Sequence, residues 1–126
     1  MQYLLPEPLA LEVSLPSPLA AYAALRELPY PFLLHSSLRD ERARWSFFGA
    51  DPFVVFRGGD FGAAREAFRR FALSARAERA PDEPPFQGGM VGYWSYDFGR
   101  RLERLPSFAV DDLGLPDFVL GGYDVV

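Results

Sequence analysis

Cysteine, lysine, asparagine, threonine and isoleucine are all absent from this chain of 126 residues. The absence of cysteine excludes disulfide bonds, thiol nucleophiles and metal sites with thiolate ligands. The absence of lysine excludes the phosphate-binding P-loop, which requires that residue. The single histidine, His35, has no nucleophile or set of metal ligands at a recognisable spacing, so we expect it to have a structural or solvent-facing role. The residues alone therefore predict no catalytic site and no metal site.

Basic residues are few and of one kind, because all 13 are arginine, against 17 acidic residues and a formal net charge of -4. The arginines are scattered and form no basic stripe, which argues against nucleic acid as a partner. No apolar run approaches the length that crosses a membrane, and no charged segment followed by an apolar one marks a signal peptide. We therefore expect a cytoplasmic protein that binds neither nucleic acid nor a membrane.

Core-forming residues are abundant, with 49% hydrophobic residues and 12 phenylalanines. A chain of this length is typical of one domain. The 12 prolines and 11 glycines argue against a helical bundle and favour short elements joined by tight turns. We therefore expect a single ordered domain over residues 1–126.

Two helices are predicted from caps and periodicity. Ser17 followed by Pro18 is a typical helix start, with serine as the N-cap and proline in the first turn. A longer helix is predicted from residue 63 to about residue 77, where Glu66 and Arg70 form an i,i+4 pair. One face of this helix carries the apolar residues that we expect to be buried: Ala64, Ala67, Phe68, Phe71, Ala72 and Ala75.

Apolar runs bounded by proline, glycine and aspartate predict the strands. They cover residues 9–15 as an edge strand, then 32–34, 45–49, 53–57, 90–96 and 118–126, with one or two helical turns over 97–104. The chain ends inside the last of these runs, and an open strand edge invites pairing. We therefore expect a chain that is either cut from a longer protein or able to pair its last strand with another polypeptide, a second copy included.

Three glycines, Gly88, Gly89 and Gly92, lie in a stretch that is dense in aromatic residues, so the backbone there must pass close to another segment or to a ligand. A dinucleotide-type phosphate site needs a strand before its glycines and a helix N-terminus after them. Here Pro84 and Pro85 precede the glycines and a β-like run follows. We therefore interpret the glycines as a bulge or a close strand contact, in preference to an anion cradle.

Other groups that could carry chemistry have simpler interpretations. The acidic residues Asp82 with Glu83, and Asp111 and Asp112 with Asp117, lie in loops flanked by proline, where turn formation and solvation explain them. Aromatic residues are expected to be mostly core, although part of the set could line a pocket for a planar ligand. This aromatic set comprises Phe32, Trp45, Phe47, Phe48, Phe53, Tyr93, Trp94 and Tyr96.

Three segments together resemble the N-terminal region of the anthranilate synthase component I family. They are residues 32–37 (Phe-Leu-Leu-His-Ser-Ser), residues 44–52 (Arg-Trp-Ser-Phe-Phe-Gly-Ala-Asp-Pro) and residues 85–106, the last followed by 115–117 and 122–124. The most specific part is the Tyr-Asp-x-Gly-Arg-Arg-x-Glu-x-Leu-Pro run inside the third segment. This run is more similar to the aminodeoxychorismate synthase component I (para-aminobenzoate synthase) branch than to the anthranilate branch.

The resemblance implies an α+β fold in which an antiparallel β-sheet with flanking helices forms the N-terminal part of a two-domain sandwich. It also implies a reaction, the addition of ammonia to chorismate at an Mg²⁺ site, with ammonia supplied by a glutamine amidotransferase, component II. In the family, the catalytic residues and the metal carboxylates lie in a C-terminal chorismate-binding domain. The resemblance therefore places no catalytic residue, cofactor or metal ligand in this chain, and Mg²⁺ belongs to the full-length enzyme.

The family's N-terminal region also carries a tryptophan pocket, which is regulatory in the anthranilate branch. Its motif positions correspond here to Leu34, His35 and Ser36, and then to Arg44, Trp45 and Ser46. His35 replaces an acid that would meet the ligand ammonium group, and Trp45 replaces a tyrosine. Both departures weaken the expectation that these six residues bind tryptophan.

Three functions follow as hypotheses. The first is the N-terminal scaffold domain of an aminodeoxychorismate synthase component I, which serves folate precursor synthesis only together with its chorismate-binding domain. The second is the corresponding domain of the anthranilate branch, with a tryptophan-binding regulatory pocket. The third is a separate subunit that completes a chorismate-binding chain in trans.

Overall fold

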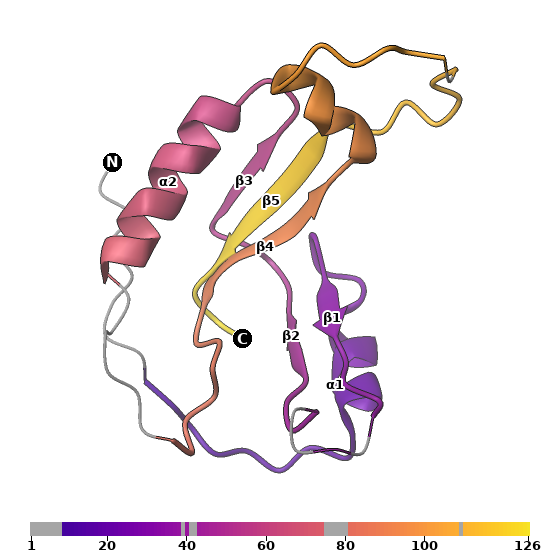
Figure 1. The fold of residues 1–126 in the computed structure, drawn as a ribbon. Coiled ribbons are helices and arrows are strands. Elements are labelled where there is room, and N and C mark those ends of the chain that lie inside the picture. The colour runs from indigo at the N-terminus through magenta and orange to yellow at the C-terminus, as the bar shows by residue number, and fades with distance from the viewer. Residues whose placement is uncertain (1–8, 39, 41–42, 75–80, 109) are drawn as a thin grey trace.

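The structure is a computed structural model that describes residues 9–38, 40, 43–74, 81–108 and 110–126. In chain order its elements are α1 (Pro18–Leu25), β1 (Phe32–Leu34), β2 (Phe47–Gly49), β3 (Val54–Arg57), α2 (Phe61–Ser74), β4 (Gly89–Trp94), the 3₁₀ helix η1 (Tyr96–Arg101) and β5 (Phe118–Tyr123) (Figure 1). β1 pairs with β2, and β3, β5 and β4 form a second sheet in that order, with all pairs antiparallel. The predicted α+β fold, with antiparallel pairing and flanking helices, is confirmed, and the strands form two sheets where one was expected.

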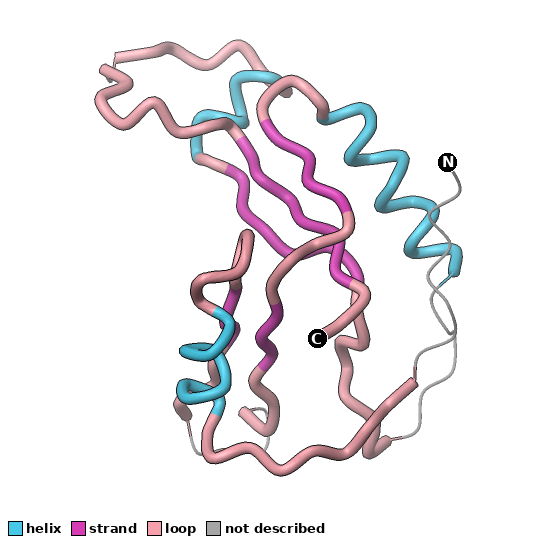
Figure 2. The backbone as a smooth tube through the Cα atoms, turned by 180° about the vertical axis from the view of Figure 1, so that it is seen from behind, coloured by secondary structure: helices cyan, strands magenta, loops and turns pink. Residues whose placement is uncertain are grey.

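The two sheets are separate and differ in size. Seen from behind, the two-stranded sheet and α1 lie beyond the end of the three-stranded sheet at which β5 finishes (Figure 2). α1 contacts both β1 and β2, whereas α2 contacts β3 and β4. Each sheet therefore has its own covering helix.

The start of α1 is the one predicted. The Ser17 hydroxyl accepts a hydrogen bond from the Ala20 N–H at 3.1 Å, and Pro18 occupies the first turn, where a missing N–H removes no helical bond. The helix ends at Leu25, ahead of Pro29, and buries Ala21. The local signals were sufficient here because capping depends only on near neighbours in the chain.

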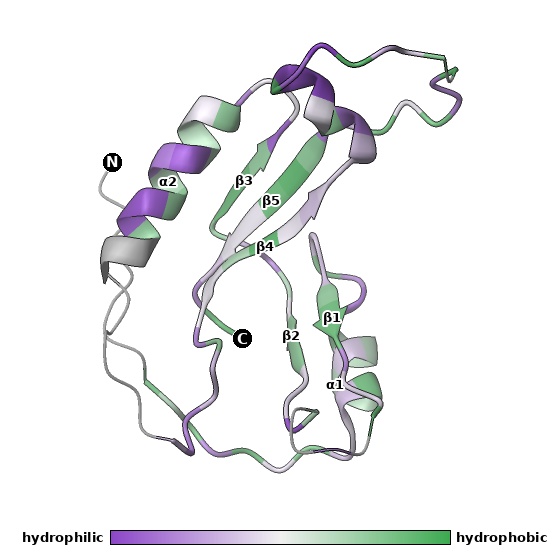
Figure 3. Cartoon of the chain, in the orientation of Figure 1, coloured by the Kyte–Doolittle hydropathy of each residue, from purple (hydrophilic) through white to green (hydrophobic). Residues whose placement is uncertain are grey.

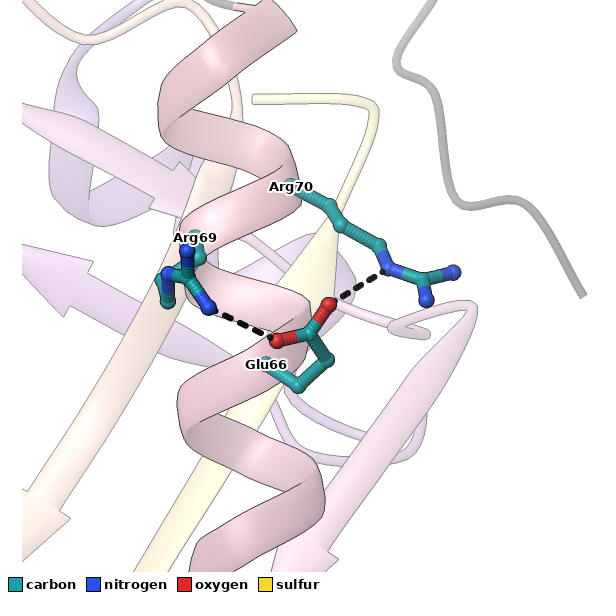
Figure 4. A network of polar contacts seen from close by, with 3 residues as sticks. All are labelled: Glu66, Arg69 and Arg70. Carbon is teal, nitrogen blue, oxygen red and sulfur yellow. Dashed lines mark hydrogen bonds and ion pairs between the residues drawn. The ribbon is translucent and has the colours of Figure 1, made fainter.

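Helix α2 buries the small residues Ala64 and Ala67 together with Phe71. Phe68, which was predicted to share this face, is 59% exposed, so that prediction is wrong. The structure does not describe the side chain of Ala72, and Ala75 lies outside the described residues. On the solvent side, Glu66 bonds Arg70 at 3.1 Å, as predicted, and also Arg69 at 3.3 Å (Figure 4). Small residues on the buried face allow the helix to approach the sheet closely.

The hydrophobic core lies between α2, η1 and one face of the three-stranded sheet. Because side chains alternate along a strand, Phe118 and Leu120 of β5 share that face with Phe56 of β3. Phe98 of η1 packs edge-on against Phe118, with ring centroids 6.0 Å apart. In the hydropathy colouring, most of β3 and the first part of β5 are green (Figure 3).

The position of β5 corrects one expectation. This strand was expected to offer an open edge, but it pairs with β3 on one side and with β4 on the other, so it is the central strand. Within the described residues, the edges of this sheet are β3 and β4. The predicted pairing of the last strand with another polypeptide therefore has no open edge of β5 to use.

The glycine stretch makes a close strand contact, as interpreted. A Cβ atom built on Gly92 would collide with the Val119 carbonyl oxygen and lie 2.8 Å from the Leu120 Cα atom. Gly88 and Gly89 have φ angles of +111° and +134°, which favour glycine. The backbones of β4 and β5 can therefore approach only because side chains are missing here.

Two further sequence predictions are wrong. Residues 9–15 form no strand, and Leu9, Leu11 and Val13 are exposed. In the aromatic set expected to form the core, Tyr96 is 96% exposed and Trp94 is 52% exposed. The aromatic core is built by other residues, namely Phe56, Phe71, Phe98, Phe118 and Tyr123.

Candidate functional site between β1 and β2

The six residues predicted from the resemblance lie at the end of the two-stranded sheet where the chain passes from β1 to β2. In the register of this sheet, Leu34 is paired with Phe47, so His35 and Ser46 are the next residues on the two facing segments. Their side chains meet, with 2.9 Å between His35 Nδ1 and Ser46 Oγ. The antiparallel pairing thus joins positions that lie 11 residues apart in the sequence.

Ser46 is the centre of this cluster. Its Oγ atom also accepts the backbone N–H of Ser36 at 3.3 Å. Because a hydroxyl both donates and accepts, its contact with His35 Nδ1 can form with either tautomer of the ring.

Arg44 and Trp45 form the other half of the predicted set. The Arg44 guanidinium carbon lies 5.7 Å from the Trp45 ring centroid, which is a cation–π distance. Arg44 also lies 3.9 Å from an Asp82 carboxylate oxygen, an exposed ion pair of small energetic value. Leu34 is 52% exposed, and Trp45 is half-buried.

The cluster offers a positively charged group and neutral polar groups, but no negative charge. The six residues supply a guanidinium group, an imidazole ring, two hydroxyls and the backbone N–H of Ser36, and no carboxylate. The ammonium group of an amino acid is normally bound by carboxylate or carbonyl oxygens. The arrangement therefore fits polar contacts that join the ends of β1 and β2 better than it fits a pocket for an ammonium group.

An aromatic contact at the opposite end of β1 holds this strand in place. The Tyr123 hydroxyl donates to the Tyr30 carbonyl oxygen at 2.7 Å, and the Tyr123 ring packs edge-on against Phe32 with centroids 4.7 Å apart. Burial raises the pKa of Tyr123 above its ordinary value of 10.0, and the neighbouring Tyr30 adds to the rise. Tyr123 therefore joins β5 to the two-stranded sheet.

Tyr30 and Tyr123 have no role that the sequence predicts. Tyr30 has a φ angle of +47°, which is uncommon for a residue with a side chain. Its position between Pro29 and Pro31 is the only local signal of a special turn, and that signal does not identify Tyr123 as the partner. A contact across 93 residues of sequence is visible only in the folded chain.

The most specific segment of the resemblance folds as η1 and the beginning of a long loop. Arg101 Nε donates to an Asp117 carboxylate oxygen at 2.6 Å, which fastens the two ends of the loop together. Arg100 donates to the Ser107 hydroxyl at 2.7 Å. Asp111 accepts the Gly114 N–H at 2.8 Å, as a turn residue would. The turn interpretation of Asp111 is thus supported.

Neither a metal site nor a membrane span is found in the described part of the chain. Among residues 9–38, 40, 43–74, 81–108 and 110–126, no three histidine, cysteine, aspartate or glutamate side chains come together in a way that could hold a metal ion. Within the same residues, no helix is long and apolar enough to cross a membrane.

Comparison with known proteins finds relatives over most of the chain. It is 41% identical over 123 residues to anthranilate synthase component 1 of Thermus thermophilus, covering 89% of this chain and 27% of the relative. It is 34% identical to aminodeoxychorismate synthase component 1 of Escherichia coli and 45% identical to that of Salmonella typhimurium, each over 119 residues, covering 82% of this chain and 26% of the relative. No protein-family model matches the chain. The chain thus spans about a quarter of the length of these relatives.

Proposed function

Because this chain belongs to the family of component 1 proteins of anthranilate and aminodeoxychorismate synthases, we propose that it is the scaffold domain of a chorismate-aminating synthase. The observation that carries the proposal is the coverage. Similarity extends over 82–89% of this chain, yet the chain corresponds to only 26–27% of the Thermus, Escherichia and Salmonella relatives. The proposal is that the chemistry belongs to the remaining three quarters.

The residues of the chain support this division of labour. The chain has no lysine or cysteine nucleophile, and its one histidine is bonded to Ser46. Asp111 and Asp117 are engaged in a turn and an ion pair, which does not fit a role as ligands of Mg²⁺. We therefore assign the Mg²⁺ implied by the family to the chorismate-binding part, and no step of the reaction to this chain.

We further assign the chain to the aminodeoxychorismate branch, which would place it in folate precursor synthesis. The support is the Tyr-Asp-x-Gly-Arg-Arg segment at Tyr96–Arg101, together with the 45% identity to the Salmonella protein. The complete enzyme would take its ammonia from a glutamine amidotransferase, component II. The chorismate-binding part can be fused to this chain or be a separate subunit.

The second candidate is the anthranilate branch with a tryptophan-binding pocket at Leu34, His35, Ser36, Arg44, Trp45 and Ser46. The 41% identity to the Thermus anthranilate synthase component favours this branch. Against a pocket stand the absence of a carboxylate in the six residues and the engagement of the Ser46 hydroxyl by His35 and Ser36. We therefore rank the pocket below a structural role for these residues.

The test combines the chain with the remaining polypeptide of the synthase. The two are supplied with chorismate, Mg²⁺ and ammonia, and the product is separated by chromatography. We expect no turnover by the chain alone and aminodeoxychorismate formation by the combination. Turnover by the chain alone would refute the scaffold assignment, and anthranilate as the product would move the chain to the other branch.

A further inference from the structure

One serine of the chain lies beside an arginine side chain in an exposed loop. Ser107 belongs to the long loop between η1 and β5, which extends beyond the three-stranded sheet at the top of Figure 1. Its hydroxyl oxygen accepts a hydrogen bond from Arg100 Nη1 at 2.7 Å. Residues 101–108 are all exposed, and residues 104–108 belong to no helix or strand. Ser107 is therefore accessible on an irregular segment, and its hydroxyl is already held next to a guanidinium group.

The sequence around Ser107 distinguishes it from every other serine of the chain. Arg104 stands three residues before Ser107, and the chain has no threonine that could compete as an acceptor. No other serine has an arginine at this spacing; the others are Ser14, Ser17, Ser36, Ser37, Ser46, Ser74 and Ser95. Arginine-directed protein kinases select their acceptor serines by such a charge pattern. The pattern and the exposure thus coincide at one residue.

A phosphoryl group on Ser107 would lie within reach of positive charge. The Arg100 guanidinium group also bonds Asp97, at 3.0 Å through Nη2, but its five N–H donors allow it to bond a phosphate as well. The Arg100 side chain is only 34% exposed, so water screens its charge less than at a fully exposed site. Residues 100–107 contain three arginines and one acid, Glu103, which also favours an anion here.

We propose that Ser107 is a phosphorylation site for an ATP-dependent serine kinase that selects acceptors preceded by arginine. In the reaction, the Ser107 oxygen forms a bond to the γ-phosphorus of ATP and the bond from that phosphorus to the β,γ-bridging oxygen breaks. ADP leaves, and the hydroxyl proton passes to a base of the kinase. Phosphorylation of this loop does not depend on the chain being a synthase domain.

The phosphate would act on the loop through Arg100. A phosphoserine carries about -1.5 to -2 charges at neutral pH and three acceptor oxygens, and bonds in which both partners are charged are the strong ones. The two ends of the loop are already joined by the Arg101–Asp117 ion pair. Phosphorylation would add a second charged contact, between Ser107 and η1, and hold residues 102–107 more firmly against that helix.

The first experiment incubates the chain with a purified arginine-directed serine kinase, ATP and Mg²⁺, and locates the phosphate by mass spectrometry. We expect one phosphate per chain, on Ser107, and none on a Ser107→Ala variant. The matched control is Ser37→Ala, which removes an exposed serine from another loop and should take up phosphate as the parent chain does. Arg104→Ala should be phosphorylated at least about tenfold more slowly, because the charge that the kinase recognises is lost.

The second experiment tests the contact with Arg100 by following the ³¹P resonance of the phosphorylated chain against pH. The second proton of a phosphoserine ordinarily binds at about pH 6. A neighbouring guanidinium group favours the doubly charged form, so we expect the midpoint to fall by about half a pH unit. Arg100→Ala should restore the ordinary midpoint, whereas Arg26→Ala, which removes an arginine of α1's C-terminal end, should leave it lowered.

A peptide of residues 100–110 serves as the positive control for the kinase. Phosphorylation of the peptide but not of the folded chain would show that the fold shields Ser107 and would overturn the proposal, as would phosphate on other serines only. Phosphate on Ser107 with the same midpoint in the parent chain and in Arg100→Ala would leave the site in place and refute the contact. The substituted serines are exposed, so their variants should fold as the parent chain does, and circular dichroism checks this.

Discussion

Replacing Gly92 with alanine tests the close approach of β4 to β5, on which the central sheet depends. Gly92 is itself exposed, so burial alone would predict a harmless substitution. The added Cβ atom would instead collide with the Val119 carbonyl oxygen and lie 2.8 Å from both the Val119 carbonyl carbon and the Leu120 Cα atom. All three are backbone atoms of the central strand, which cannot move away as a flexible side chain would.

The expected cost follows from this geometry. Overpacking a tight site costs about 1–3 kcal/mol, and contacts with backbone atoms belong at the upper end of that range. Typical net stability for a chain of this size is about 6–19 kcal/mol, from roughly 0.05–0.15 kcal/mol per residue. A loss of about 3 kcal/mol would lower the melting temperature by roughly 10 °C.

The assay is thermal unfolding followed by circular dichroism, with Gly59→Ala as the matched control. Gly59 lies in the turn after β3, and a Cβ atom there would meet nothing within 4 Å. We expect the control to change the unfolding free energy by less than about 1 kcal/mol. A Gly92→Ala variant that melts with the control would refute the proposed contact between the two backbones.

Three further predictions concern contacts of the two sheets and of the loop between η1 and β5. Tyr123→Phe should lower the free energy of unfolding by about 1 kcal/mol, because the bond to the Tyr30 carbonyl is lost. Since the pKa of Tyr123 is raised in the folded state, the stability that this raised pKa contributes is complete below pH 10.0 and is lost as the pH rises through the folded-state value. Urea titrations across this pH range should therefore show a smaller decline in unfolding free energy for the variant than for the parent chain. Arg101→Ala should leave global stability within about 1 kcal/mol but speed proteolytic cleavage between residues 102 and 116, whereas Arg26→Ala, which removes another exposed ion pair, should leave the cleavage rate unchanged. His35→Glu combined with Trp45→Tyr restores both residues of the tryptophan-pocket motif. Calorimetry should therefore detect tryptophan binding by the double variant and none by the parent chain. Tryptophan binding by the parent chain would contradict a structural role for the six residues of the predicted pocket.

The sequence by itself determined those features that depend on near neighbours in the chain. Ser17 and Pro18 begin α1 as predicted, since capping needs only the next few residues. The Glu66–Arg70 pair and the burial of Ala64, Ala67 and Phe71 follow from helical periodicity. The family, too, is identified by local motifs, because the resemblance carried by residues 32–37, 44–52 and 85–106 agrees with the relatives found over most of the chain.

The tertiary structure alone decided which segments meet. Nothing local in residues 118–126 indicates that β5 lies between β3 and β4, because strand order depends on which distant pairings bury the most surface. The same holds for the bond from Tyr123 to Tyr30 and for the contact of His35 with Ser46. Phe68 and Tyr96 are aromatic residues like Phe71 and Phe98, but only the second pair faces the three-stranded sheet. Whether a side chain is buried depends on the segment that packs over it, and the sequence does not show which segment that is.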